Sequence, residues 1–141
     1  MLATFLVGSA TTVLGDDTGY AGDGRFAFQW ESWAVDSQVQ ITPAYQSPAP
    51  VKLAQGNADR KLAFRVGQSL GTLAAICAFL KSIDALVNAT GTLTLQPDAT
   101  KANTLTYANA VLKSATLVAN AANSAGMRVG ISYKFEALTV V

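Results

Sequence analysis

The regular alternation of apolar and polar side chains in residues 127–140, "MRVGISYKFEALTV", is the feature that most restricts how this chain folds. Successive side chains of a β-strand point to opposite faces, so this alternation predicts a strand with one buried side. The apolar face holds Met127, Val129, Ile131, Tyr133 and Phe135, and the other face holds Arg128, Ser132, Lys134 and Glu136. The stretch therefore predicts a half-buried strand of a sheet.

Several shorter segments repeat this two-residue period and predict further strands. The side chains expected to point inward are Phe26, Phe28, Trp30, Val39, Ile41, Leu62, Phe64, Val66, Leu93 and Leu95. Trp33 breaks the alternation after Trp30, which indicates a β-bulge or the end of that strand. Residues 1–15 predict a strand and a turn. The prolines within residues 43–56 predict a long loop, because proline donates no hydrogen bond to a sheet.

The period changes to three or four residues between about Ser69 and Val87, which predicts one helix. Its apolar stripe consists of Leu73, Ile76, Cys77, Leu80, Ile83 and Val87. Because the opposite face is polar, we expect the helix to lie on a sheet. Ser69 is the expected N-cap, and Asn88 to Gly91 are expected to end the helix. The single cysteine, Cys77, is expected to be a buried and unreactive thiol.

Residues 104–118 fit two interpretations. The alanines favour a helix with an apolar stripe from Tyr107 to Val118, whereas the lead-in "NTLTY" alternates like a strand. We predict a strand over about 104–118, and the helix remains the alternative for its second half. In a strand, Asn109 would face inward and would need a hydrogen-bond partner, for which a neighbouring loop is the simplest source.

The segment "GDDTGYAGDG", residues 15–24, is the best candidate for a site in this sequence. Its aspartates do not have EF-hand spacing, and a single glycine repeat is too little for a calcium-binding array. A glycosidase also uses two carboxylates, but a small chain without an evident cleft argues against one. Asp and Gly favour turns, so we predict a loop between two strands that contacts a neighbouring subunit. Its candidate contact residues are Asp16, Asp17, Tyr20 and Asp23.

Charged side chains are scarce: they make up 13% of the 141 residues, against about 25% in typical soluble domains. With a net charge of +1 and no basic block, the sequence offers no patch for nucleic acid or for an anionic membrane. A surface with so few charges is poorly soluble unless other subunits cover it, so we expect assembly. The alternative is the uncharged, Ser- and Thr-rich surface that is common in stable secreted β-proteins.

The chain contains no histidine, which removes the Ser-His-Asp and Cys-His arrangements and most zinc and iron sites. It also lacks a Walker loop, the "GxSxG" nucleophile motif and the dinucleotide-binding fingerprint. Residues 1–15 have no basic start and no continuous apolar run, so we expect neither a signal peptide nor membrane binding. The sequence therefore predicts a single β-rich domain over residues 1–141 that is not an enzyme and uses no cofactor or metal.

From residue 57 onward the order of elements resembles small tail and baseplate proteins of long-tailed bacteriophages. The resemblance rests on "NADRKLAFRV", the helix "SLGTLAAICAFLKSID", "GTLTL", "LTYANAVLKSATL" and the last strand "GMRVGISYKFEAL". It covers more than half of the chain and does not extend to residues 1–50. It implies a tail-tube-like fold of the α+β class, an antiparallel β-sandwich or barrel with one flanking helix at about 69–87.

The resemblance also implies a virion structural protein of the phage tail, in the tube, tip or baseplate, made in the host cytoplasm. Its implied partners are copies of itself in a ring and other tail proteins, with DNA passing through the lumen without being read. It carries over no catalytic residues. A second interpretation is a carbohydrate- or partner-binding β-sandwich module that uses Trp30, Trp33 and Tyr20 as a platform for sugar rings. The two-residue period argues against it, because it turns Trp30 inward with Phe26 and Phe28.

Overall fold

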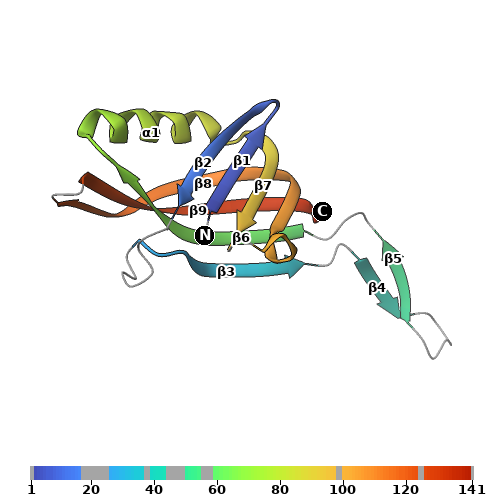
Figure 1. The fold of residues 1–141 in the computed structure, drawn as a ribbon. Coiled ribbons are helices and arrows are strands. Elements are labelled where there is room, and N and C mark those ends of the chain that lie inside the picture. The colour runs from blue at the N-terminus through green and yellow to red at the C-terminus, as the bar shows by residue number, and fades with distance from the viewer. Residues whose placement is uncertain are drawn as a thin grey trace.

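The computed structural model describes residues 2–16, 26–36, 39–43, 50–54, 59–97, 100–123 and 126–140. Within these residues, seven strands form one antiparallel sheet in the order β2-β1-β7-β8-β9-β6-β3, and one helix, α1, lies over part of it (Figure 1). The strands of this sheet are β1 (Leu2–Val7), β2 (Ala10–Asp16), β3 (Gln29–Asp36), β6 (Asp59–Leu70), β7 (Thr90–Gln96), β8 (Leu105–Asn123) and β9 (Gly126–Val140). A short 3₁₀ turn, Lys101–Asn103, precedes β8. The fold is therefore β-rich and of the α+β class, as the sequence predicted.

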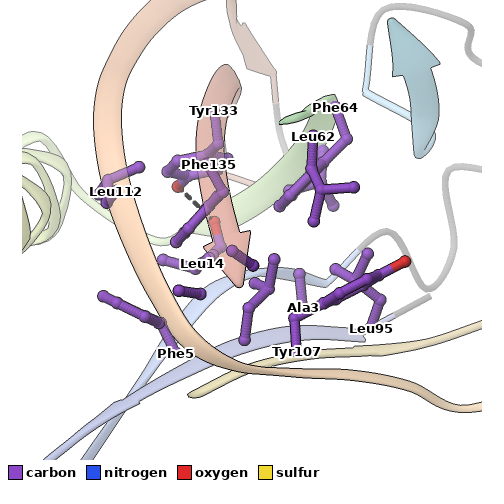
Figure 2. Close-up of a cluster of buried hydrophobic side chains, with 14 of the residues drawn as sticks. Ala3, Phe5, Leu14, Leu62, Phe64, Leu95, Tyr107, Leu112, Tyr133 and Phe135 are labelled. Carbon is purple, nitrogen blue, oxygen red and sulfur yellow. Dashed lines mark hydrogen bonds between the residues drawn. The ribbon is translucent and has the colours of Figure 1, made fainter. Parts of the chain in front are cut away.

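The alternating segments turn their apolar side chains to one side of the sheet, where they form the core. Its members include Ala3, Phe5, Leu14, Leu62, Phe64, Val66, Leu93, Leu95, Tyr107, Leu112, Ile131, Tyr133 and Phe135. The Phe135 ring stacks on Phe64 with centroids 5.9 Å apart and meets Phe5 edge-on at 5.1 Å (Figure 2). The inward-facing side chains predicted within 61–66, 91–96 and 129–135 are confirmed.

The sheet is strongly curved, so that its edge strand β2 lies against β6. The buried Tyr133 hydroxyl on β9 donates a hydrogen bond of 2.6 Å to the Leu14 carbonyl oxygen on β2. The backbone N–H of Asp16 donates one of 3.1 Å to Oε1 of Gln68 on β6. No hydrogen-bonded ladder joins β2 to β6 among the described residues, so the sheet is curled but not closed into a barrel.

Helix α1 spans Leu73–Leu86 and begins later than predicted. Its N-cap is Thr72, whose Oγ1 accepts a hydrogen bond of 3.1 Å from the backbone N–H of Ala75. The predicted cap, Ser69, lies instead in β6, because that strand stays paired with β9 beyond this position. The predicted stop is confirmed, since Asn88 adopts a φ of 69° just after the helix.

Only part of the predicted helical stripe is buried. Ile76 and Ile83 are buried beneath the helix, whereas Leu73 is 63% exposed in its first turn. Cys77 is exposed, so the prediction of a buried thiol is wrong. It follows Ile76 by about 100° around the helix, and α1 meets the sheet along too narrow a line to cover both positions.

Strand β8 runs from Leu105 to Asn123, so the ambiguous stretch is a strand along its full length. Its pairing with β7 shifts register between Gly91 and Leu93, where β8 has one residue more than β7. Asn109 lies at this bulge with a φ of 53° and is exposed, so the prediction that it faces inward is wrong. Asparagine adopts this left-handed conformation more readily than most residues, which suits it to a bulge.

Both predicted long loops contain strand residues. Gly15 and Asp16 belong to β2. Within the predicted loop 43–56, β5 (Pro50–Ala54) pairs with β4 (Val39–Pro43) in a separate two-stranded sheet that projects away from the larger one (Figure 1). Proline fits at the end of a strand that has a free edge, and each strand of a two-stranded hairpin has one. The prolines of this region therefore do not exclude a strand here.

Candidate assembly surface

The predicted contact loop is only partly within the described residues. Asp16 ends β2 and is half-buried, with its backbone N–H bound to Gln68. Asp17, Tyr20 and Asp23 lie outside the described residues, so their role between subunits stays a prediction. The described part of the chain offers two other surfaces, the edge strand β3 and a hollow lined by lysines.

Strand β3 pairs with β6 on one side and with no strand on its other side among the described residues. Its pairing shifts register between Trp30 and Ser32 and the strand continues to Asp36, so of the two predicted alternatives the bulge is confirmed and the end of the strand is wrong. After this shift, Trp30 lies opposite Phe64 and Trp33 lies opposite Leu62, and both partners are core residues of β6. The two tryptophans therefore share the core-facing side of β3.

The two tryptophans pack against the edge of the core, where no further strand among the described residues covers them. Trp30 packs edge-on against Phe28, with ring centroids 5.5 Å apart. Nε1 of Trp33 donates a hydrogen bond of 3.3 Å to the Tyr107 hydroxyl near the start of β8. Trp30 nevertheless remains 40% exposed, Trp33 59% and Val35 41%, and these three side chains form what we name the β3 apolar face.

The other edge strand, β2, has less free backbone. Its Leu14 carbonyl and its Asp16 N–H already bond the side chains of Tyr133 and Gln68. Burial raises the pKa of the Tyr133 hydroxyl well above its usual range, so this group remains a hydrogen-bond donor in the alkaline range as well as at neutral pH. In β3, by contrast, every residue except Ala34 is exposed. Because an edge strand with unpaired backbone groups is a site for pairing with another chain, β3 is the better candidate for an intermolecular contact.

Three lysines surround a hollow of about 320 Å³ on the side of the sheet away from the core. Lys61 on β6 and Lys134 on β9 alternate with core residues along their strands, and Lys113 comes from β8. Ser32 and Glu136 complete the polar part of the lining. We name this site the lysine hollow, and its chemistry suits it to anionic groups.

Sequence reasoning missed the lysine hollow. Lys61 and Lys134 were predictable as outward-facing residues, but their proximity depends on the register between β6 and β9. Lys113 lies where β8 shifts register against β9, in the half of the strand whose structure was ambiguous from sequence. The only signal in the sequence was the placement of lysines on the polar side of two strands.

Comparison with known proteins identifies no family for this chain, because the sequence matches no protein-family model and no curated protein. Within the described residues, no three or more His, Cys, Asp or Glu side chains are grouped to hold a metal ion. In the same residues, no helix is long and apolar enough to cross a bilayer. The features that distinguish this molecule are thus the β3 apolar face, which offers aromatic surface and free backbone, and the lysine hollow, which offers positive charge.

Proposed function

We propose that this protein is a structural subunit of a bacteriophage tail, in the tube, tip or baseplate, that assembles with copies of itself into a ring. The observation that carries this proposal is the β3 apolar face on an edge strand with a free side. The resemblance from residue 57 onward supports a phage tail, with other tail proteins as further partners. In this proposal the curled sheet is a tail-tube-like sandwich or barrel, DNA passes through the lumen unread, and the protein is not an enzyme.

The β3 apolar face gives a physical reason for subunits to associate. The exposed fractions of Trp30 and Trp33, 40% and 59%, add up to about one whole tryptophan side chain, or roughly 200 Å². Covering that area contributes about 5 kcal/mol at 25 cal/mol/Å². The cost of association offsets much of this gain, so one such contact is weak and the several contacts of a ring reinforce one another.

The β4–β5 hairpin supplies a second surface for assembly. A two-stranded hairpin is only marginally stable by itself in water. Among the described strands, β4 and β5 pair only with each other. Contact with a neighbouring subunit would therefore stabilise the hairpin. In this proposal the protein is made in the host cytoplasm and works in the virion, where such neighbours are present.

Native mass spectrometry and negative-stain microscopy of the purified chain test this proposal. We expect rings, or the oligomers that precede them, at micromolar concentration. Val35→Lys on the β3 apolar face should abolish them, because a charge cannot be buried there without a partner. Val13→Lys on β2 is the matched control, since Val13 is 39% exposed and Val35 41%. A wild-type protein that stays monomeric, or equal behaviour of the two variants, would overturn the proposal.

A carbohydrate-binding module is the second candidate, and one observation favours it. The bulge in β3 places Trp30 and Trp33 on the same face, and both are partly exposed, as a platform for sugar rings requires. Tyr20, the third predicted member, lies outside the described residues. If this candidate holds, affinity electrophoresis in soluble polysaccharides would retard a monomeric wild type, and Trp33→Ala would remove the retardation.

A further inference from the structure

We propose that β3 of one subunit pairs with the second half of β8 in the next subunit, and that Trp30 and Trp33 fill the space between that half and α1. This inference rests on the proposed ring and names the surface that receives the β3 apolar face. Such a surface needs an unpaired edge, a matching strand direction and room for two tryptophan side chains. Residues 113–123 of β8, together with α1, meet these three requirements.

The second half of β8 is an edge of the sheet, although β8 is not the last strand in the order. Strand β7 pairs with β8 only from Leu105 to Val111. The Asn88 N–H, just after α1, then donates a hydrogen bond of 2.8 Å to the Leu112 carbonyl oxygen. Beyond this point, residues 113–123 pair with β9 alone among the described residues. This stretch is longer than β3, which has 8 residues, and its free side is open to pairing.

The strand directions allow this pairing in a ring. In the order β8-β9-β6-β3 every neighbouring pair is antiparallel, so β3 and β8 run in opposite directions. Rotation about a ring axis preserves how each strand runs along that axis. Strand β3 of one subunit therefore meets β8 of the next as an antiparallel pair. In such strand addition the main-chain hydrogen bonds give affinity, and pockets for alternate side chains give specificity.

Helix α1 leaves two hollows beside this edge, on the core-facing side of the sheet. One, of about 210 Å³, is lined by Leu73 and Ile76 of α1 and by Leu117 of β8. The other, of about 160 Å³, lies between Leu80 of α1 and the same Leu117. Leu117 is 46% exposed although its partner on β9, Ile131, is buried. We name the two hollows together the α1 groove.

The α1 groove matches the exposed tryptophans of β3 in side, number and chemistry. Trp30 and Trp33 lie on the core-facing side of β3, and a β3 strand that extends the sheet keeps them on the side where α1 lies. The exposed part of each tryptophan then has one hollow to fill. Covering Leu73 and Leu117 together with the two tryptophans removes apolar surface of both subunits from water. Tryptophan is also enriched where subunits meet.

The strand registers set the offset between neighbouring subunits. Within one subunit, the pairings of β3, β6, β9 and β8 place Trp33 level with Leu112. Ala115 and Leu117, which line the α1 groove, lie about three to five residues further along β8, or roughly 10–17 Å. Four strand spacings add about 19 Å across the strands. A flat ring then tilts its strands by roughly 30–40° from the axis, close to the tilt of about 35–45° in β-barrels.

Two β-bulges restrict where the ladder forms. The pairing of β8 with β9 shifts at Lys113 and at Val118, so it is regular over residues 114–117 between them. Bulges are one means by which edge strands avoid pairing with the wrong partner. Here they confine the ladder to a short stretch beside the α1 groove. The side chains of the β3 apolar face therefore supply most of the contact.

Disulfide trapping in the full-length chain tests the pairing. In a Cys77→Ser background, Ser32→Cys on β3 is combined with Thr116→Cys or with Val118→Cys on β8, the two positions that the offset places opposite Ser32. Paired strands bring opposite Cα atoms to about 4.5–5.5 Å, within reach of a disulfide. Within one subunit, three strand spacings, or about 14 Å, separate β3 from β8 and prevent the bond.

We expect a mild oxidant to link at least one of the two pairs into a ladder of covalent oligomers that ends at the size of the ring. Ser32→Cys with Thr11→Cys, an exposed position on the edge strand β2, is the matched control and should give no ladder. A covalent dimer of Ser32→Cys alone would show that β3 pairs with β3 about a two-fold axis and would refute this contact. Rings that form normally while neither pair gives a ladder would refute it too.

A charge placed in the α1 groove tests the side-chain part of the contact. Leu117→Lys should raise the concentration at which half of the protein is assembled about tenfold or more, measured by analytical ultracentrifugation. Leu105→Lys, on the half of β8 that β7 covers, is the matched control, since Leu105 is 42% exposed and Leu117 46%. Circular dichroism melts establish that both variants are folded. Normal assembly of Leu117→Lys would overturn this contact and leave the ring in place, whereas a wild type that never assembles would overturn both.

Discussion

Replacing Tyr133 with Phe tests whether the contact between β9 and β2 holds the curled sheet together. The Tyr133 side chain is fully buried, and its hydroxyl donates a hydrogen bond of 2.6 Å to Leu14, 119 residues away in the sequence (Figure 2). Phenylalanine keeps the ring and its packing, so only the hydroxyl is lost. The Leu14 carbonyl oxygen then stays buried without this partner, which costs about 1–3 kcal/mol.

A loss of about 2 kcal/mol lowers the melting temperature of a 141-residue chain by roughly 7 °C. Tyr107→Phe is the matched control, because it also removes one tyrosine hydroxyl from the core. That hydroxyl accepts a hydrogen bond of 3.3 Å from Trp33, which is 59% exposed. Water replaces the lost partner of Trp33, so the control should cost less than about 1 kcal/mol.

The same hydroxyl makes stability depend on pH in the alkaline range. Burial raises the pKa of Tyr133 in the folded protein above the value of about 10 that tyrosine has in an unfolded chain. Above about pH 10 the unfolded state loses this proton while the folded state keeps it, so the free energy of unfolding falls by up to about 1.4 kcal/mol per pH unit. Tyr133→Phe cannot titrate, so the difference between wild type and variant should shrink there.

Urea unfolding followed by circular dichroism, at neutral pH and at about pH 11, measures both the loss of the hydrogen bond and the pH dependence of stability. We expect the variant to be clearly less stable at neutral pH and nearly equal to wild type at the higher pH. Equal stability at neutral pH would show that the hydrogen bond does not hold β2 against the sheet. A difference that stays constant across this range would show that the hydroxyl titrates normally and is not buried.

Three further predictions concern packing and metal binding. Ile83→Ala should lower the free energy of unfolding by about 2–5 kcal/mol, because the Ile83 side chain is only 3% exposed. Leu73→Ala on the same helix should lower it by under about 0.5 kcal/mol, because Leu73 is 63% exposed, and thermal melts of the two variants measure the difference. Gly91→Ala should cost about 1–3 kcal/mol in urea unfolding, because its Cβ would collide with the Leu6 carbonyl oxygen. Residues 15–24 should bind no calcium tightly, so a chelator should leave the melting temperature unchanged.

The sequence predicted those strands in which one face meets the core and the other meets water. In β9 the alternation places the apolar side chains of Val129, Ile131, Tyr133 and Phe135 in the core, because burial of one face selects apolar residues at every second position. Ser132, on the other face, is also buried, and the alternation does not reveal this. The helix start was not predictable, because Ser69 and Thr72 are both good N-caps. Only the pairing of β6 with β9, a contact between distant parts of the chain, keeps Ser69 in a strand.

The exposure of the candidate sites was also beyond sequence reasoning. The period places Trp30 on the core-facing side correctly, but it does not reveal whether another strand lies beside it. Because β3 ends the sheet, Trp30 and Trp33 face the core and still reach solvent. Likewise, Lys61 and Lys134 both line the lysine hollow because of the register between β6 and β9, which the sequence of neither strand reveals by itself.

The two edges of the sheet differ, and this difference limits how subunits join. Every neighbouring pair in the seven-stranded order is antiparallel, so β2 and β3 run in the same direction. Joining β3 of one subunit to β2 of the next around a ring axis would therefore create a parallel pair. That pairing needs free backbone on β2, where Leu14 and Asp16 already bond Tyr133 and Gln68. We therefore expect that β3 does not pair with β2 of the next subunit, and a density map of the ring with β3 hydrogen-bonded to β2 would contradict this.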